Sequence, residues 1–294
     1  MADFKFGLIG TGRFGKHYIR LLHEIPGIEL AAIANKSQGN TEAVLTDPEI
    51  DCIVICTPAS THFEYIKKAL VNGKHVLTEK PMVLSVSEAV KVLEQVKTSD
   101  KIFMVAHQNL FNKHVVYLAE QIRQGILGKL LQVTIEHLYP GPIREDVGVF
   151  WDAAPHDFAI LDFVVGPVLV KTASGEKRYT AGRKVEDYVA ANVELANGTK
   201  VMMTLSSNAE KKVRRRVFVG DKGSAVFDDS ENNDFLEISA NGKRIIPQIA
   251  VAEPLRTELE HFIDCVRNKK IPLTNVEHGL RVIKNLESTY EKLK

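Results

Sequence analysis

The chain has 294 residues, of which 45% are hydrophobic and 26% charged, and its formal net charge at pH 7 is +1. This length suits two domains, and the balanced charge argues against a nucleic-acid partner or an anionic membrane surface. No apolar run reaches membrane-spanning length and no signal peptide precedes the first predicted strand, so a cytoplasmic protein is expected. The three cysteines, Cys52, Cys56 and Cys265, lack metal-ligand spacing, so we expect buried free thiols and no metal.

Strand and helix patterns alternate through the first third of the chain. The predicted strands are 4–9, 29–34, 51–56, 75–78 and 102–106, and the predicted helices are 14–24, 61–72 and 86–98. Alternation of this kind predicts a doubly wound parallel sheet with helices on its faces.

Three glycines follow the first predicted strand directly. Gly10, Gly12 and Gly15 form the pattern G-x-G-x-x-G between an apolar run and an amphipathic segment. In a dinucleotide-binding unit the first glycine permits a tight turn, the second admits a pyrophosphate, and the third lets the helix pack on the strand. The pyrophosphate would lie at the helix N-terminus, where free N–H groups and the helix dipole favour an anion. The alternative is a purely structural glycine turn.

Strand patterns predominate from about residue 114. A predicted helix at 115–124 is followed by predicted strands at 130–138, 168–174, 187–195, 199–206, 214–220 and 223–228, and helices at 255–267 and 277–291 close the chain. Asn197-Gly198 and Lys222-Gly223 are typical hairpin turns. The fold class expected is α/β: a dinucleotide-binding domain over 1–112, then an α+β domain over 113–294 with a large, mainly antiparallel open sheet. The last helix is a candidate for packing back on the first domain.

Two further segments lie at predicted strand ends, where ligands bind in open α/β sheets. Thr57-Pro58 would border the cofactor, or else would form a proline-shaped turn before a helix capped by Ser60 or Thr61. Lys80, within Glu79-Lys80-Pro81, carries an ammonium group that can stabilise negative charge developing on a substrate oxygen. The alternative for Lys80 is a surface lysine beside a proline turn.

Asp152 and His156 are four residues apart and would share one face of a helix. Histidine titrates near neutrality and is a candidate proton acceptor from an alcohol, while Asp152 would orient it or bind the substrate. Proline is tolerated in the first turn of a helix but not in its interior, so regular helix is expected only after Pro155. The alternative is a buried histidine with a structural aspartate partner.

In order and spacing, these motifs resemble the Gfo/Idh/MocA family of nicotinamide-dependent sugar oxidoreductases. The resemblance covers nearly the whole chain and includes the glycine motif, the VICTP strand end, Glu79-Lys80-Pro81 and the Asp152/His156 pair. It implies a Rossmann domain followed by an α/β domain that binds the substrate and mediates oligomerisation, because its open sheet is commonly buried in a homodimer or homotetramer. It also implies that Lys80, Asp152 and His156 are catalytic, with His156 as the general acid/base.

The resemblance further implies a set of binding residues. The cofactor would be bound by Gly10, Thr11, Gly12, Arg13, Phe14, Gly15, Asn35, Lys36, Thr57, Pro58, His62, Glu79 and Lys80. The substrate, a sugar or sugar nucleotide, would be bound by Lys80, His107, Asn109, Arg144, Trp151, Asp152 and His156. The reaction implied is hydride transfer between the nicotinamide C4 and a secondary alcohol carbon, with His156 exchanging the hydroxyl proton.

A finer resemblance is to the WDxxPHD branch of the family, carried by residues 144–157 and by the segment 212–229. Members of that branch are often linked to nucleotide-sugar biosynthesis, which implies an activated amino sugar or uronate such as a UDP-N-acetylhexosamine. Arg144, Lys212 and Arg215 would then meet the diphosphate. Their alternative is a solvated strand face or a subunit contact, and the basic run 211–216 is interpreted in the same way as a solvated edge.

The chain departs from the family pattern after its second predicted strand. Asn35 stands where an acidic residue usually binds the ribose 2′-OH, and Lys36 would attract a 2′-phosphate, so the cofactor is NAD or NADP with a lean to NADP. The link 38–48 is short, with only a remnant helix at 41–45, so the adenosine side is expected to be open. Two alternatives to the oxidoreductase remain: a non-catalytic ligand sensor on the same fold, and an NAD-dependent redox-elimination glycosidase.

Overall fold

A computed structural model describes residues 3–35, 37, 39–141, 146–180, 182–230, 234–250 and 252–294. The chain forms two compact units, the first made of Met1–His107 with Leu255–Ile283 and the second of Gln108–Pro254 with Lys284–Lys294. The predicted boundary at residue 112 divides the chain into two continuous domains. Each unit of the structure, by contrast, consists of two separate segments of the chain. The segment 255–283 joins the first unit because its apolar side chains, such as the buried Phe262, pack against the first sheet.

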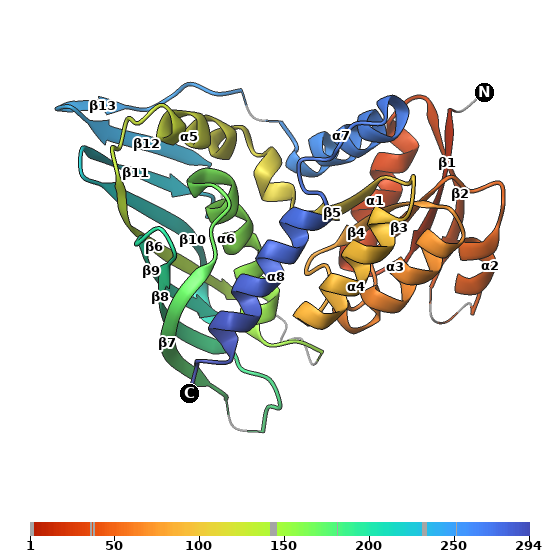
Figure 1. Ribbon diagram of the computed structural model, residues 1–294, viewed down its shortest axis with the longest axis horizontal. Coiled ribbons are helices and arrows are strands. Elements are labelled where there is room, and N and C mark those ends of the chain that lie inside the picture. Colours follow the sequence, from red (N-terminus) through yellow and green to blue (C-terminus); the bar gives the residue numbers. More distant parts are fainter. Residues whose placement is uncertain are drawn as a thin grey trace. The chain divides into compact units, whose positions relative to one another are not determined.

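The first unit contains a five-stranded sheet in the order β2-β1-β3-β4-β5, with every neighbouring pair parallel (Figure 1). Its strands are β1 (Phe4–Ile9), β2 (Ile28–Ala34), β3 (Cys52–Ile55), β4 (His75–Glu79) and β5 (Phe103–Ala106). Side chains alternate across β1, so its two faces meet different helices. Phe6 packs edge-on against Phe262 of α7 (Pro254–Asn268), at 6.3 Å between ring centroids, whereas Gly7 lies against Val44 of α2 (Thr41–Thr46).

The helices that connect these strands are α1 (Arg13–Glu24), α2, the 3-10 turn η1 (Ala59–Thr61), α3 (His62–Val71) and α4 (Val86–Lys97). The predicted remnant helix is confirmed as α2, and the described residues between β2 and β3 form no further strand. Chain order therefore reverses between β1 and β3. In doubly wound sheets the ligand site lies at such a switch point, outside the carboxyl ends of the strands.

The second unit contains an eight-stranded sheet in the order β13-β12-β11-β10-β6-β9-β8-β7. Its strands are β6 (Leu130–Pro140), β7 (Val170–Arg178), β8 (Tyr188–Leu195), β9 (Lys200–Ser206), β10 (Asn208–Gly220), β11 (Gly223–Asp228), β12 (Phe235–Ala240) and β13 (Lys243–Ile245). Neighbouring strands are antiparallel except for β6 and β9. The predicted fold class is thus confirmed, although β12 and the three-residue strand β13 were not predicted.

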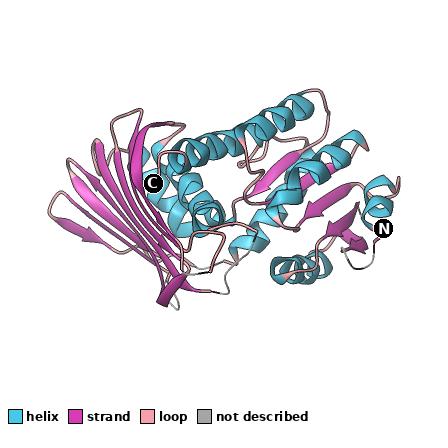
Figure 2. Ribbon diagram, turned by 90° about the horizontal axis from the view of Figure 1, so that it is seen from below, coloured by secondary structure: helices cyan, strands magenta, loops and turns pink. Residues whose placement is uncertain are grey.

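One face of this sheet packs on helices, as Figure 2 shows. The helices of the unit are the 3-10 turn η2 (Gln108–Phe111), α5 (Lys113–Arg123), α6 (Val149–Val165) and the last part of α8 (Val276–Tyr290). The expectation that the helix begins only after Pro155 is wrong, since α6 begins at Val149 and contains Pro155. Glu186, which is far away in sequence, caps the N-terminus of α6, because its carboxylate accepts the Phe150 N–H at 3.2 Å.

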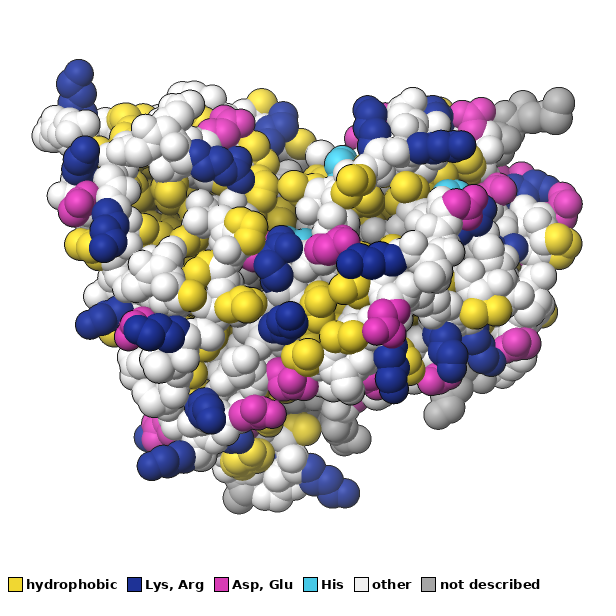
Figure 3. Space-filling view, viewed as in Figure 1, with side chains coloured by type: hydrophobic (Ala, Val, Ile, Leu, Met, Phe, Trp, Pro, Cys, Tyr) yellow, Lys and Arg dark blue, Asp and Glu magenta, His cyan; other side chains and the backbone are white. Residues whose placement is uncertain are grey.

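Charged side chains of both signs are interspersed over the face seen in Figure 3. The interpretation of the basic run 211–216 as a solvated edge is correct for the exposed Arg215 but wrong for Arg216. Arg216 is buried in β10, where Asp157 and Asp229 compensate its charge. Among the described helices, none has both the length and the apolar character needed to cross a membrane.

Candidate active site

The glycine motif forms a turn whose three glycines have different surroundings. Gly10 has φ of +101°, and a Cβ there would lie 2.5 Å from the carbonyl oxygen of Cys56. A Cβ on Gly15 would lie 2.1 Å from the carbonyl oxygen of Gly10. At Gly12, by contrast, no described atom lies within 4 Å of the Cβ position. Two glycines thus let the chain pack on itself, and the third faces open space.

The N-terminus of α1 borders this open space. Gly12 is the N-cap residue and offers no side-chain cap, so the first-turn amides of α1 face the space in front of it. Such amides, together with the helix dipole, suit an anion. The cradle therefore fits the pyrophosphate of a dinucleotide. Of the other predicted contacts here, Thr11 and Phe14 are half-buried and Arg13 is exposed.

Asn35 follows β2 directly and lies beside the glycine turn, because the Gly10 N–H donates to the Ala34 carbonyl at 2.8 Å. Its side-chain oxygen accepts the Ser37 hydroxyl at 2.6 Å. The residue is uncharged, so no carboxylate stands at this position to repel a 2′-phosphate. Lys36, the other residue on which the NADP lean depends, lies outside the described residues.

The ends of β3 and β4 are joined by His62. Its Nε2 is 2.9 Å from the Thr57 carbonyl oxygen and its Nδ1 is 2.8 Å from the Pro81 carbonyl oxygen. Because both ring nitrogens are directed at backbone carbonyls, the buried His62 links the segments that follow β3 and β4. Thr57 and Pro58 lie at the carboxyl edge, as expected from strand order, and Thr57 Oγ1 accepts the Thr61 hydroxyl at 2.7 Å.

Glu79 ends β4 and Lys80 follows it, at the same edge of the sheet. Glu79 is buried and Lys80 half-buried. The Lys80 backbone N–H donates to Glu79 Oε2 at 3.2 Å, so the side chain of one residue holds the backbone of the next. The glycine turn, Thr57, Glu79 and Lys80 are therefore brought together at the carboxyl ends of neighbouring strands β1, β3 and β4.

His107 follows β5 and is 1% exposed. The His107 ring centroid lies 5.2 Å from that of His278. Neither nitrogen of the His107 ring has a hydrogen-bond partner among the described residues. Burial, then His278 and Lys80, lowers the pKa of His107 well below 6.5, so the ring is neutral at pH 7. Asn109, in the second unit, likewise has an amide nitrogen unpartnered within the described chain. Buried donors of this kind suit a ligand that supplies the missing partner.

In the second unit, α6 and β6 present facing polar side chains. Asp152 and His156 share one face of α6, and Tyr139 of β6 donates its hydroxyl proton to Asp152 Oδ2 at 2.8 Å. His137, two residues before Tyr139 and so on the same face of the strand, has its ring 6.2 Å from that of His156. The predicted pair thus lies together, against two strand residues that the sequence analysis did not identify.

A buried ionic network supports this face. His137 Nδ1 is 3.0 Å from Asp157 Oδ2, Arg216 Nη2 is 2.7 Å from Asp157 Oδ1, and Arg216 Nη1 is 2.5 Å from Asp229 Oδ1. Burial alone would raise the pKa of Asp157, but Arg216 and His137 outweigh burial and lower it to about 2. Burial lowers the pKa of His137, so its neutral ring donates from Nδ1 to the ionised Asp157. The network therefore fixes the tautomer of His137.

Trp151 packs close to the start of α6 on the ring of Tyr290, at 6.1 Å between centroids. Tyr290 donates its hydroxyl proton to Glu186 Oε2 at 3.1 Å, and Glu186 is the residue that caps α6. A Cβ on Gly148 would lie 2.0 Å from the Glu186 carboxylate, so a larger residue there would displace the carboxylate that caps α6. Arg144, another predicted substrate ligand, lies outside the described residues.

The residues that sequence reasoning missed are His137, Tyr139, Asp157 in its ionic role, and Arg216. One signal could have found the first two: β6 places Val133 and Ile135 on its buried face and then His137 and Tyr139 at the next two positions. Polar groups at the end of an apolar strand face indicate a site. Arg216 offered no signal, because it stands within a run of basic residues.

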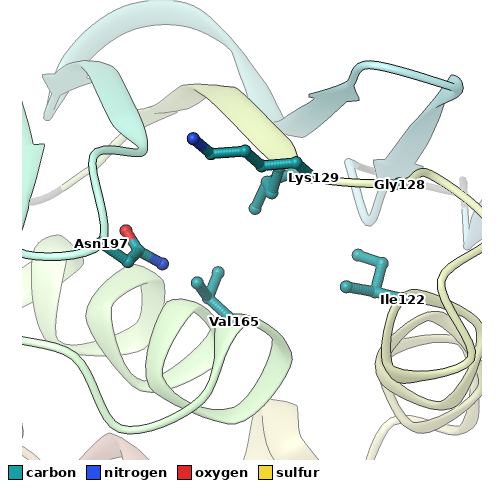
Figure 4. A pocket seen from close by; sticks show the side chains of 6 residues that line it. Ile122, Gly128, Lys129, Val165 and Asn197 are labelled. Atoms are coloured by element: carbon teal, nitrogen blue, oxygen red, sulfur yellow. The ribbon is translucent and has the colours of Figure 1, made fainter.

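A separate pocket of about 360 Å³ opens at the beginning of β6 (Figure 4). It is lined by Ile122, Gly128, Lys129, Leu130, Val165 and Asn197. It lies at the opposite end of β6 from His137 and Tyr139, and its only charged lining group is the exposed Lys129. Within the described ranges, no three His, Cys, Asp or Glu side chains gather in a way that would hold a metal ion.

Comparisons with known proteins match both parts of the chain. Residues 4–107 match the model of an oxidoreductase family with an NAD-binding Rossmann fold, and residues 119–294 match the C-terminal alpha/beta domain of the same family. Scyllo-inositol 2-dehydrogenase (NAD(+)) from Bacillus subtilis is 29% identical over 90% of this chain and 87% of its own. Inositol 2-dehydrogenase from Rhizobium meliloti is 26% identical, over 89% of this chain and 88% of its own.

Solved structures share the fold over the whole length. UDP-N-acetylglucosamine 3-dehydrogenase from Acidithiobacillus ferrooxidans covers 100% of this chain and 98% of its own, with a TM-score of 0.87 at 22% identity. A 3-ketoreductase from Actinomadura kijaniata covers 99% and 98%, with a TM-score of 0.87 at 17% identity. The chain therefore belongs to the Gfo/Idh/MocA family, an oxidoreductase family with an NAD-binding Rossmann fold and a C-terminal α/β domain.

Proposed function

We propose that this oxidoreductase transfers a hydride between a nicotinamide cofactor and a secondary alcohol of a sugar or sugar nucleotide. The observation that carries the proposal is the polar face of the second unit, where Asp152 and His156 lie against Tyr139 and His137. Carboxylate, imidazole and phenol groups side by side can each exchange hydrogen bonds with sugar hydroxyls. Similar proteins carry the names of inositol and UDP-N-acetylglucosamine dehydrogenases, whose substrates are rich in hydroxyls.

The proposed roles follow from the chemistry of each side chain. His156 takes the proton of the substrate hydroxyl and returns it in the reverse direction. Lys80 stabilises negative charge on the same oxygen. Asp152, held by the Tyr139 hydroxyl, binds a substrate hydroxyl and orients His156. When bound, the nicotinamide supplies the hydride acceptor or donor.

The proposed cofactor contacts come from the first unit. Gly12 and the first-turn amides of α1 hold the pyrophosphate, while Thr57, Pro58, Glu79 and Lys80 contact the rest of the cofactor from the ends of β3 and β4. NADP(H) is favoured over NAD(H) because the uncharged Asn35 presents no carboxylate to a 2′-phosphate. Among sugars, the WDxxPHD resemblance favours a UDP-N-acetylhexosamine, with Arg144 as a diphosphate ligand.

Two further proposals concern the state of the protein. The three free thiols support a reducing compartment, and we place the enzyme in the cytoplasm. The face of the eight-stranded sheet opposite α5 and α6 carries Val217 and Val226 in register with each other, with Met202 nearby. This face supports a homodimer or homotetramer.

The first test is a fluorescence titration of the purified protein with NADH and, separately, with NADPH. Binding of either, with tighter binding of NADPH, is expected. Inositols and UDP-N-acetylhexosamines are then screened with the preferred cofactor for a change in nicotinamide absorbance. Absence of binding at millimolar concentrations would contradict the proposal and favour a ligand sensor on the same fold.

His156→Asn tests the acid/base role. Asparagine keeps a polar group but does not titrate, so turnover at neutral pH is expected to fall by about 10² to 10⁴-fold. In the oxidation direction, the remaining rate should rise with pH, because hydroxide replaces the lost base. A variant whose pH profile matches that of the wild type would exclude His156 as the base.

A further inference from the structure

A buried tyrosine joins three segments of the first unit that are far apart in sequence. Tyr18 Oη on α1 lies 3.2 Å from Oε1 of Glu79, at the end of β4, and 3.3 Å from Oε2 of Glu258 on α7. Tyr18 and Glu258 are fully buried and Glu79 is 8% exposed. Figure 1 shows α7 alongside α1 in this unit.

The number of protons decides how this cluster is bonded. A phenol hydroxyl has one proton, so Tyr18 can donate to only one of the two carboxyl groups. The other short contact needs a proton on a carboxyl group, which then donates to the Tyr18 oxygen. Glu258 Oε1 has no hydrogen-bond partner in the described chain, and a buried carboxylate with an unpartnered oxygen is far more costly than a neutral carboxyl group. The proton therefore belongs on Glu258 Oε2.

The chain of hydrogen bonds then has one direction. Glu258 donates to Tyr18, Tyr18 donates to Glu79 Oε1, and Glu79 Oε2 accepts the backbone N–H of Lys80. Each link is held by a different element, since α7, α1 and β4 meet there. The last link fixes the backbone from which the Lys80 side chain extends.

We propose that Tyr18 and Glu258 are positioning residues for Lys80, acting through a buried chain in which Glu258 holds a proton and Glu79 accepts from both Tyr18 and Lys80. The proposal rests on the proposed function in one respect, the catalytic part given to Lys80. The chain also connects Lys80 to α1, the helix whose first turn forms the pyrophosphate cradle.

The surroundings of Glu258 support a neutral carboxyl group. The groups that act on it electrostatically are Glu79 on β4 and Tyr18 on α1, and the thiol of Cys56, after β3, shares the cluster. Burial, and then Glu79, raises the pKa of Glu258 well above 4.5 and outweighs the hydrogen bond with Tyr18, which lowers it. Burial also raises the pKa values of Tyr18 and Cys56, so both are neutral at pH 7.

The first test measures stability and needs neither cofactor nor substrate. Native Glu258 keeps a proton that the unfolded chain releases above a pKa of about 4.3, so wild-type stability falls as pH rises. Glu258→Gln removes this term. Above about pH 5.5, and until native Glu258 itself releases its proton, the unfolding constant of the wild type should rise relative to that of E258Q, by up to tenfold per pH unit.

The matched control is Glu260→Gln on the same helix, where the exposed Glu260 lies 3.7 Å from Arg256. E260Q should keep the pH dependence of the wild type. An E258Q protein with the same pH dependence as the wild type would overturn the proposal, because Glu258 would then be ionised in the native state.

The second test separates hydrogen bonding from packing. Glutamine donates from its amide and leucine does not, although both have about the volume of glutamate. E258Q is expected to keep kcat within about twofold of the wild type, whereas Glu258→Leu and Tyr18→Phe should lower kcat about tenfold with a smaller change in KM. Equal kcat values for E258Q and E258L would overturn the positioning role. If E258L does not fold, Y18F compared with E258Q decides the question.

The two tests also separate this proposal from the proposed function. If wild-type protein turns over no sugar while E258Q loses the pH dependence of stability, the proton assignment holds but the positioning role falls together with the catalytic role of Lys80. If sugars are turned over and E258Q keeps the wild-type pH dependence, only the buried chain is overturned.

Discussion

Glu79 and Lys80 are adjacent residues with different tasks: Glu79 holds the backbone, and Lys80 presents a charge at the edge of the sheet. The Lys80 backbone N–H is bound by Glu79, while the Lys80 side chain leaves β4 half-buried at the carboxyl edge. The ammonium group also contributes to lowering the pKa of His107, which places positive charge close to that ring. A cation held at this edge suits charge that develops on a substrate oxygen.

Lys80→Met keeps the length of the side chain and removes its charge. We expect kcat to fall about 10² to 10⁴-fold, because the charge acts on the transition state, while the NADH dissociation constant changes less than about threefold. Steady-state kinetics and a fluorescence titration measure the two quantities. Equal losses in both would assign Lys80 to cofactor binding instead.

At the scale of elements, the glycine turn connects β1 to α1 with two contacts that tolerate no Cβ. The turn also leaves one position open. Gly10 needs its positive φ, and Gly15 needs its lack of a Cβ, for α1 to pack against the turn. Gly12 has no such need within the described chain, so its lack of a side chain serves whatever occupies the space in front of it.

Gly12→Ala and Gly15→Ala therefore form a matched pair. The added methyl of G15A would overlap the Gly10 carbonyl, so a loss of about 1–3 kcal/mol in unfolding free energy is expected. G12A should unfold within about 0.5 kcal/mol of the wild type but bind NADH at least about tenfold more weakly. Urea unfolding and NADH titration check both. Unchanged NADH affinity in G12A would show that the pyrophosphate lies elsewhere.

The contact between β6, α6 and β10 depends on Asp157, which lies between His137 and Arg216. Its pKa is lowered to about 2 in the folded chain, against 3.8 for an ordinary aspartate. The ionised form therefore stabilises the fold above about pH 4, and this stabilisation is lost as pH falls from about 4 to about 2.

Asp157→Asn should lower the unfolding free energy at pH 7 by about 3–5 kcal/mol, because the buried Arg216 loses one of its two ionised partners and keeps only Asp229. The difference from the wild type should shrink below about pH 4, where wild-type Asp157 also takes up a proton. Urea unfolding at several pH values measures this. As a control, Asp228→Asn, near the exposed Arg215, should change stability by less than about 0.5 kcal/mol. A D157N deficit that is constant with pH would contradict the assignment.

At the scale of the whole molecule, the large sheet has two unlike faces. The face toward α5 and α6 is buried, with Val133, Ile135 and Phe218 along its central strands. On the other face, Met202 is 40% exposed and Val217 is half-buried. Apolar side chains in register over neighbouring strands are typical of a surface that another protein covers.

Val217→Glu places a charge at the centre of this face without altering the buried side. If copies of the chain associate through it, sedimentation velocity should show the wild type as a dimer or tetramer and V217E as a monomer with unchanged circular dichroism. Lys243→Glu, on the edge strand β13, is the control and should leave the oligomer intact. A monomeric wild type would contradict the proposed assembly.

The sequence by itself determined the parts of the protein that depend on neighbours along the chain. The G-x-G-x-x-G turn, the alternating strands and helices, the short link after β2 and the i, i+4 pair of Asp152 and His156 are all local patterns, and the family follows from their order. The family, the fold class and the oxidoreductase class are confirmed.

Only the tertiary structure decided which residues meet across elements. Glu186 caps α6, and His137 and Tyr139 face Asp152 and His156. Asp157 and Asp229 pair with Arg216, and Tyr18 connects Glu79 with Glu258. The partners in these contacts come from different strands and helices, and strand register decides which side chains face each other. Side chains alternate across β10, so two neighbouring arginines have opposite surroundings. Arg216 is buried in ion pairs, whereas Arg215, the residue before it, lies at the surface.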